Sequence, residues 1–173
     1  LRANVGDSYR LGLEIDANIF ISKHFTIQPN LALSTNKNLD INASLDGELV
    51  NLGNTNIAYS PNVVFGSSFN YLPISNLQIS LLSKYVGEQY MANIDNDNSK
   101  LESYFVNDIN VNYQINFKKV LKSIVLNALI NNIFNVEYVS NGYYYTYEDT
   151  WSVPLEITTL DGAGYYPQAT INF

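Results

Sequence analysis

The sequence predicts an all-β protein, an antiparallel transmembrane β-barrel segment built from about seven long strands. Three observations lead to this fold class. Apolar and polar residues alternate without a break over long stretches, and the connections between these stretches alternate between short and long. In addition, 46% of the residues are apolar but only 14% are charged, with 25 Asn and 14 Tyr among the uncharged residues. This composition favours strands joined by polar connections.

The stretch VNDINVNYQINF, residues 106–117, shows the alternation most clearly. A helix would mix its apolar and polar positions around its circumference, whereas successive side chains of a strand point to opposite faces. The stretch is therefore a strand with one apolar and one amide-rich face. The same argument, applied in order along the chain, predicts strands at about 8–21, 25–37, 57–71, 76–91, 103–117, 122–134 and 164–173.

The connections alternate in length along the chain. Short ones are expected at 22–24, 72–76 and 117–122, a medium one at 92–102, and long ones at 37–56 and 135–164. If consecutive strands are antiparallel, all short connections lie at one edge and all longer ones at the other. This asymmetry is typical of outer-membrane barrels, which have short periplasmic turns and longer extracellular loops.

The two faces of the strands receive different environments in this interpretation. The apolar face, with Ile109, Val111, Tyr113 and Ile115, is predicted to contact lipid. Aromatic residues near both strand ends match the aromatic girdles of such barrels. The polar face is predicted to line the lumen through Glu14, Asp16, Asp108, Asn110, Asn112 and Gln114. A soluble β-sandwich remains open as an alternative, because its outer face would also alternate with a buried one.

Several classes of protein are disfavoured by composition. The net charge of −7 argues against nucleic-acid binding, and no run approaches the roughly 20 apolar residues of a membrane helix. The single histidine, His24, lies in a short turn away from any expected acid or nucleophile. We therefore predict no enzyme activity, no catalytic residues, no metal site and no cofactor. IDNDN, residues 94–98, resembles half of a calcium loop but lacks its glycine and later glutamate, so a solvated loop is expected.

The connection at 135–164 contains NGYYYTYEDTW, residues 141–151. Clustered exposed aromatic residues often mark binding surfaces. Candidate ligand contacts are Tyr144, Tyr145, Tyr147 and Trp151, whereas Tyr138 and Tyr143 are expected in the outer aromatic girdle.

Three segments resemble the C-terminal part of TonB-dependent outer-membrane receptors, particularly those of Bacteroidetes-like bacteria. They are KYVGEQYMANIDNDNSKLESYFVNDINVNYQI (84–115), NALINNIFNVEYVSNGY (127–143) and YYPQATINF (165–173). Within them, NNIFNVEY looks like the family's Asn-Leu-Phe-Asn segment at the end of the penultimate strand. The first half of the chain matches only as generic barrel strand.

The resemblance implies a barrel of about 22 strands whose lumen is filled by an N-terminal plug. Residues 1–173 would be a C-terminal part of that barrel, with the plug absent. The implied function is TonB-dependent uptake of a nutrient across the outer membrane of a Gram-negative bacterium, by the family's commonest use a ferric siderophore or related iron chelate. The implied partners are outer-membrane lipid, the nutrient ligand and, through the absent plug, the TonB complex.

Two alternatives accompany this interpretation. One is a small complete outer-membrane barrel of about eight strands with an adhesion or structural role. The other is the soluble β-sandwich, acting as a binding module through its Tyr-rich loop.

Overall fold

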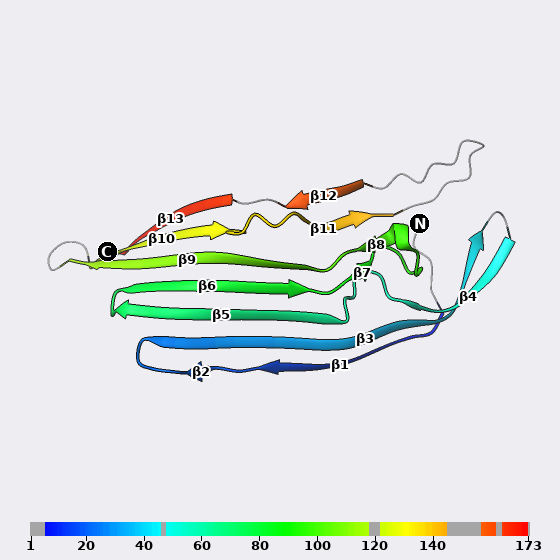
Figure 1. The fold of residues 1–173 in the computed structure, drawn as a ribbon, viewed down its shortest axis with the longest axis horizontal. Coiled ribbons are helices and arrows are strands. Elements are labelled where there is room, and N and C mark those ends of the chain that lie inside the picture. The colour runs from blue at the N-terminus through cyan, green and yellow to red at the C-terminus, as the bar shows by residue number, and fades with distance from the viewer. Residues whose placement is uncertain (1–5, 46–47, 118–121, 145–156, 162–163, 173) are drawn as a thin grey trace.

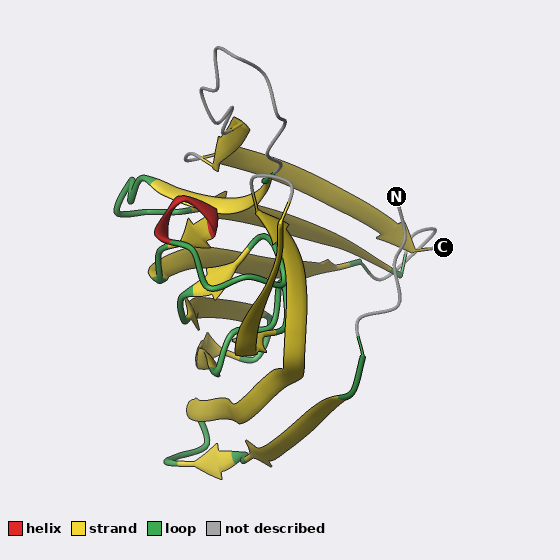
Figure 2. Ribbon diagram, turned by 90° about the vertical axis from the view of Figure 1, so that its right-hand side faces the viewer, coloured by secondary structure: helices red, strands yellow, loops and turns green. Residues whose placement is uncertain are grey.

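The fold is dominated by one curved antiparallel sheet (Figures 1 and 2). The computed structural model describes residues 6–45, 48–117, 122–144, 157–161 and 164–172. The main strands, in their order across the sheet, are β1 (Ser8–Asp16), β3 (Phe25–Leu45), β5 (Val63–Ile74), β6 (Leu77–Val86), β9 (Tyr104–Asn116), β10 (Ser123–Asn131) and β13 (Gly164–Asn172). The all-β, antiparallel prediction is confirmed.

Shorter elements extend the sheet or form hairpins beside it. β2 (Ile19–Phe20) and β4 (Glu48–Asn56) both pair with β3. Two further strand pairs are not hydrogen-bonded to the main sheet. They are β7 (Gln89–Tyr90) with β8 (Lys100–Leu101), which enclose the single-turn 3-10 helix η1 (Asp97–Ser99), and β11 (Tyr138–Tyr143) with β12 (Ile157–Asp161).

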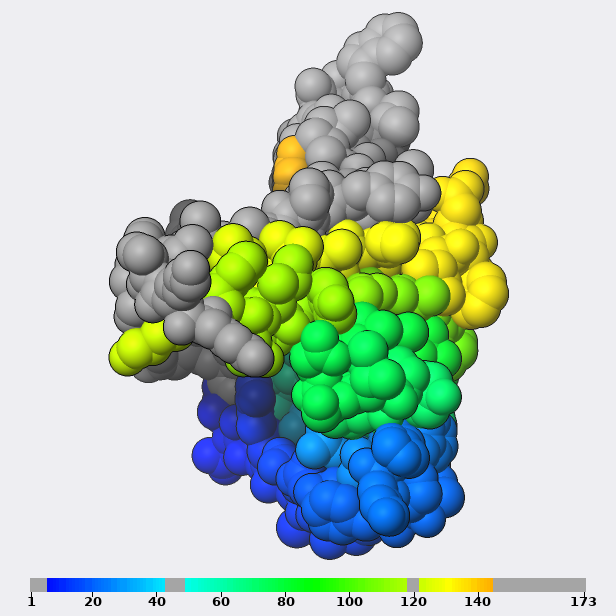
Figure 3. All heavy atoms as spheres, turned by 90° about the vertical axis from the view of Figure 1, so that its left-hand side faces the viewer, coloured from blue at the N-terminus to red at the C-terminus, as the bar shows by residue number. Residues whose placement is uncertain are grey.

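The connections divide between the two ends of the sheet. Figure 1 shows the turns before β3 and between β5 and β6 at one end, together with the end of β9 and the start of β10; Figure 3 views this end directly. The β3–β4 hairpin, the β7–β8 segment and β11 lie at the other end, called the loop end below. The alternation of short and long connections therefore produces the asymmetry expected from the sequence.

The strand registers separate an apolar face from a polar face. On the apolar face Phe69, Leu81 and Ile109 lie side by side on three consecutive strands. The apolar side chains of β1 are strongly exposed, with Leu11 at 70% and Leu13 at 58%. Within the described residues no second sheet packs on this face, in contrast to a β-sandwich. A large exposed apolar surface of this kind marks a region that contacts another protein or a membrane.

The main sheet ends at β1 on one side and β13 on the other, and these two strands do not pair with each other. Figure 2, which looks along the strands, shows the resulting open wall. Among the described residues, then, the sheet does not close into the small complete barrel considered as an alternative.

Several strand boundaries differ from those expected. β6 ends at Val86 rather than at 91, and the predicted connection 135–164 contains β11 and β12. β3 continues to Leu45 and pairs with β4, where the sequence predicted a loop at 37–56. In this extension Leu39, Ile41, Ala43 and Leu45 alternate with polar residues, but the many Asn residues between 36 and 56 had favoured a loop. β5 begins only at Val63, because Tyr59 has a left-handed backbone with φ of 51° and Pro61 has no N–H to offer a neighbouring strand.

Buried apolar side chains gather at the loop end rather than along the sheet. Those buried in the described part of the chain are Ile41, Val86, Met91, Leu101 and Val106. Ile41 lies in the part of β3 that pairs with β4, Met91 and Leu101 lie in the β7–β8 segment, and Val86 and Val106 lie at the adjoining ends of β6 and β9. No helix in the described residues is long and apolar enough to cross a membrane.

Candidate functional site

Three connections meet at the loop end and are joined by side-chain to backbone hydrogen bonds. The carboxylate of Asp95 accepts two bonds from Asn56, one from its backbone N–H at 2.8 Å and one from its Nδ2 at 2.9 Å. Asn93 Oδ1 accepts from the backbone N–H of Ala58 at 2.8 Å, and the carbonyl of Asn93 accepts from Thr55 Oγ1 at 2.9 Å. The β7–β8 segment thus holds the end of β4 and the start of the β4–β5 connection.

The β7–β8 segment is itself ordered by local bonds. The Asn96 side chain accepts from the backbone N–H of Asn98 at 2.9 Å and caps η1. Ser99 is fully buried and donates to the Asn96 carbonyl at 2.9 Å. The stretch predicted as a solvated loop is exposed at residues 95–98 and is at the same time ordered by these bonds. Both carboxylate oxygens of Asp95 are bonded to Asn56. Within the described residues no group of three or more carboxylate, His or Cys side chains could hold a metal ion.

Tyr59 links the β4–β5 connection to two other segments. Its backbone N–H donates to the Tyr90 carbonyl at 2.8 Å, and its hydroxyl donates to the Gly142 carbonyl on β11. Burial raises the pKa of Tyr59 above its usual value of 10.0. The hydroxyl therefore stays protonated, and able to donate, at every physiological pH.

A shallow, open depression of about 610 Å³ lies beside Tyr59 at the loop end. Among the described residues its lining consists of Tyr59, Gln89, Ser140, Asn141 and Gly142, none of which is charged. A second hollow of about 280 Å³ lies on the polar face of β1 and β3 and also includes Tyr59. Tyr59 therefore lines both hollows. The sequence did not indicate this residue as part of a site.

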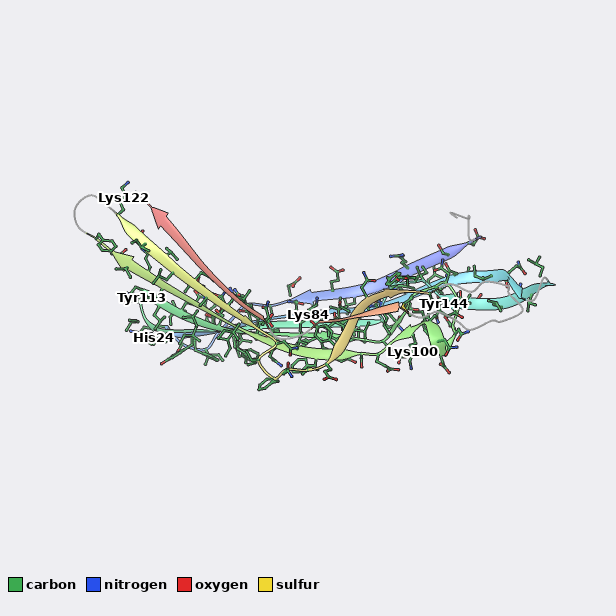
Figure 4. The ribbon with its side chains drawn as sticks, turned by 90° about the horizontal axis from the view of Figure 1, so that it is seen from above. His24, Lys84, Lys100, Tyr113, Lys122 and Tyr144 are labelled. Atoms are coloured by element: carbon green, nitrogen blue, oxygen red, sulfur yellow. The ribbon has the colours of Figure 1, made fainter. Side chains whose placement is uncertain are left out.

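The predicted aromatic residues divide into described and undescribed ones. Tyr144 lies at the loop end, where its hydroxyl accepts a hydrogen bond from Asn96 Nδ2 at 3.4 Å (Figure 4). Tyr145, Tyr147 and Trp151 lie outside the described residues. Tyr138, expected in the outer girdle, instead stacks on Tyr104 with ring centroids 4.3 Å apart. The register places Tyr104 opposite Val86, on the polar face of the sheet.

An ion-pair cluster of one lysine and two glutamates flanks the β7–β8 segment. Lys100 lies between Glu102 and Glu88, with its Nζ 3.1 Å and 3.6 Å from their carboxylate oxygens. The hydrogen bond and charge of Glu102, followed by the charge of Glu88, raise the pKa of Lys100. Burial raises the pKa of Tyr90, and the nearby charges of Asp95 and Glu88 raise it further.

The six residues predicted to line the lumen share one face of the sheet. The registers link Glu14 to Ala32 and onward through β5 and β6 to the polar face of β9. On that face Asn110, Asn112 and Asn127 form a cyclic triad, in which each side-chain amide donates to the next at 2.5 to 3.3 Å. Two further contacts involve the remaining residues of β9: Gln114 donates to Asn116 Oδ1, and Asp108 accepts from the backbone N–H of Asn132.

Comparison with known proteins identifies related sequences and folds. The model of the family described as TonB dependent receptor-like, beta-barrel matches residues 1–133. No curated protein matches the chain. The structure is similar to the siderophore receptor PiuA from Acinetobacter baumannii, with a TM-score of 0.64 and 17% identity over 96% of this chain. It is also similar to the ferric yersiniabactin uptake receptor FyuA from Yersinia pestis, with a TM-score of 0.70 and 19% identity over 98% of this chain.

The chain spans 22% of the length of PiuA and 24% of the length of FyuA. At these identities the similarity to the two structures concerns the fold. The family match covers the strands from β1 to β10 and so rests on sequence independently of that fold.

Proposed function

This chain belongs to the TonB-dependent receptor β-barrel family, and from that membership we propose that it forms wall and extracellular loops of an outer-membrane nutrient receptor. The open sheet is the observation that carries the proposal. It has one strongly exposed apolar face, one amide-lined face and long connections at a single end. A segment of a large barrel has these three properties together, because lipid, lumen and cell exterior are different environments.

In this proposal residues 1–173 are a C-terminal part of a barrel of about 22 strands, whose remaining strands continue from β1 and β13. Glu14, Asp16, Asp108, Asn110, Asn112 and Gln114 face the lumen, where the family's plug lies. Tyr144 is a candidate ligand contact at the loop end, together with Tyr145, Tyr147 and Trp151 of the same connection. The apolar face contacts outer-membrane lipid.

The proposed ligand is a ferric siderophore or a related iron chelate. Support comes from the two similar structures, which are a siderophore receptor and a ferric yersiniabactin receptor. Uptake would be energised by the TonB complex acting through the plug. The family consists of transport receptors, in agreement with the expectation that the chain is not an enzyme.

The proposal is tested by iron uptake in cells that produce the complete receptor containing this chain. A strain lacking the receptor should lose uptake of at least one member of a panel of radiolabelled ferric chelates. The complete receptor should restore it, but only in cells with an intact TonB complex. Normal uptake of the whole panel by the receptor-deficient strain would contradict an iron chelate as the ligand.

A further inference from the structure

Two oppositely charged side chains line the open hollow of about 280 Å³ on the polar face of β1 and β3, which lie side by side (Figure 1). Arg10 and Glu14 lie four positions apart on β1, so they point to the same face of the strand. Both are exposed, and within the described residues neither side chain forms a hydrogen bond or an ion pair. In this part of the chain, one end of the hollow therefore has an unpaired guanidinium and the other an unpaired carboxylate.

The space between the two charges is lined by residues with little or no side chain. Gly12 lies between Arg10 and Glu14 on β1, and a Cβ added there would lie only 3.0 Å from the carbonyl oxygen of Leu33. Ala32 lies directly opposite Glu14 on β3. No large side chain of β1 therefore separates the two charged groups on this face.

Hydrogen bonds fix one wall of the hollow, which is the β4–β5 connection. Ser34 Oγ donates to the Pro61 carbonyl at 3.1 Å, and the Ser34 backbone N–H donates to the Asn62 carbonyl at 2.8 Å. Asn36 Nδ2 donates to Ser34 Oγ at 2.8 Å. These neutral groups bond to one another and hold the shape of the hollow, which leaves the charged groups at its two ends for recognition of a ligand.

We propose that this hollow binds a zwitterionic, peptide-like part of the ligand, with a carboxylate bound by Arg10 and an ammonium bound by Glu14. The inference rests on the receptor function proposed above and names the chemistry of one ligand contact on the barrel wall. A guanidinium can form two parallel charge-assisted hydrogen bonds with a carboxylate, and a carboxylate accepts such bonds from an ammonium. A ligand with both charges is attracted at both ends, whereas like charges at the two ends would be repelled at one of them.

The spacing of the two charges indicates the length of the bound part. The Cα atoms of Arg10 and Glu14 are about 13 Å apart, at roughly 3.4 Å per residue of strand. Their side chains shorten the gap that the ligand has to bridge. An extended tripeptide spans about 10 Å, at roughly 3.3–3.6 Å per residue, and therefore fits between them. Triglycine is the simplest probe with these properties.

Protection of Arg10 from chemical modification tests the site directly. The purified complete receptor is treated with cyclohexanedione, which modifies arginine, and mass spectrometry measures the modified fraction of the peptide that contains Arg10. Four forms of triglycine are compared: the free peptide, its N-acetyl form, its C-terminal amide and the form with both caps. We expect the free peptide to protect Arg10 at a concentration at least about tenfold lower than any capped form, the effect of losing one charge-assisted hydrogen bond.

Two variants assign the ammonium contact to Glu14. Glu14→Gln should weaken protection by the free peptide about tenfold, to the level of the N-acetyl form, because the ammonium loses its charged partner. Protection by the N-acetyl form should not change. Asp16→Asn is the matched control: Asp16 lies on the same face of β1 but does not line the hollow, so all four results should stay as in the unmodified receptor. Circular dichroism verifies the fold of each variant.

Equal protection by the free and the doubly capped peptide, including none by either, would overturn the inference. An equal effect of the two variants would do the same. Resistance of Arg10 to modification in the ligand-free receptor would also overturn it, because the guanidinium would then already have a partner. These outcomes leave the proposed iron-chelate uptake standing. Conversely, a receptor that fails the uptake test but shows the expected protection would keep this site and lose the iron chelate as its ligand.

Discussion

At the scale of single residues, hydrogen bonds of Tyr59 offset the free-energy cost of its left-handed backbone conformation. A left-handed backbone costs a residue with a side chain about 1–2 kcal/mol. Tyr59 compensates through its N–H, bonded to Tyr90, and its hydroxyl, bonded to Gly142. One residue therefore joins the β4–β5 connection, β7 and β11.

The variant Tyr59→Phe keeps the ring but removes the hydroxyl. We expect a loss of about 0.5–1.5 kcal/mol in the local stability of the loop end, the usual net worth of one hydrogen bond. Hydrogen–deuterium exchange of the peptide covering residues 138–143 should become faster, with little change elsewhere. Tyr71→Phe, at the short-turn end of β5, serves as the control and should leave that peptide unchanged.

Neighbouring residues on β9 should respond oppositely to charge. Val111 lies beside Ile79 and Ala128 on the apolar face, whereas Asn112 belongs to the amide triad. Val111→Arg should destabilise the assembled barrel by about 2–4 kcal/mol, the cost of Arg near the middle of the bilayer. Asn112→Arg should cost clearly less. Urea titration of the complete receptor in lipid vesicles measures both, and equal costs would contradict the assignment of the faces.

At the scale of elements, the β7–β8 segment holds the start of the β4–β5 connection in place by hydrogen bonds. Asp95 uses its side chain for a segment 39 residues away in the chain, and Asn93 for one 35 residues away. These bonds fix the loops before any ligand arrives, which reduces the ordering cost of binding.

Replacement of Asp95 by Ala should free the start of the β4–β5 connection from the β7–β8 segment. The backbone N–H of Asn56 would lose its acceptor, at a cost of about 1–3 kcal/mol for a hydrogen bond to a charged group. Exchange of the Asn56 and Ala58 amides should accelerate, which mass spectrometry of the 48–62 peptide would detect. Asp97→Ala provides the matched control: the residue is exposed, lies two positions away, and should change this peptide little.

The sequence predicted the strands better than the contact between the β7–β8 segment and the β4–β5 connection, and the reason is physical. Alternation along 106–117 reflects local geometry, since each side chain is assigned to a face by its position alone. The partnership of Asp95 with Asn56 depends on how distant segments meet, and nothing in IDNDN specifies it. The β3–β4 hairpin was predicted as a loop because its high Asn content outweighed the alternation of Leu39, Ile41, Ala43 and Leu45. Tyr59 was missed because tyrosine is not a residue type that indicates a left-handed backbone.

At the scale of the whole molecule, the described sheet has two edge strands that each lack a second partner strand, and it also has an exposed apolar face. β1 and β13 each have one side without a strand partner in the described structure. Unpaired edges invite association with other strands. Further strands at both edges and lipid on the apolar face, as proposed above, would provide partners for the backbone groups and cover the apolar side chains.

Residues 1–173 produced alone should reproduce this requirement. We expect the isolated chain to sediment as aggregate in buffer and to remain in solution only with detergent. Ultracentrifugation with and without detergent makes the comparison. The complete receptor in detergent should additionally migrate faster on unheated than on heated gels, because closed barrels resist unfolding by the gel detergent. A soluble monomer of the isolated chain in plain buffer would contradict the membrane assignment.

The amide triad of Asn110, Asn112 and Asn127 has a mechanical consequence. Each of the three side chains donates once and accepts once within the triad, which commits about half of its bonding capacity. If this face lines the lumen as proposed, a segment that moves along it would meet neutral amides with only part of their bonding capacity available. We expect low friction on this side of the lumen, where a row of Lys or Glu would instead grip a passing chain and resist its motion.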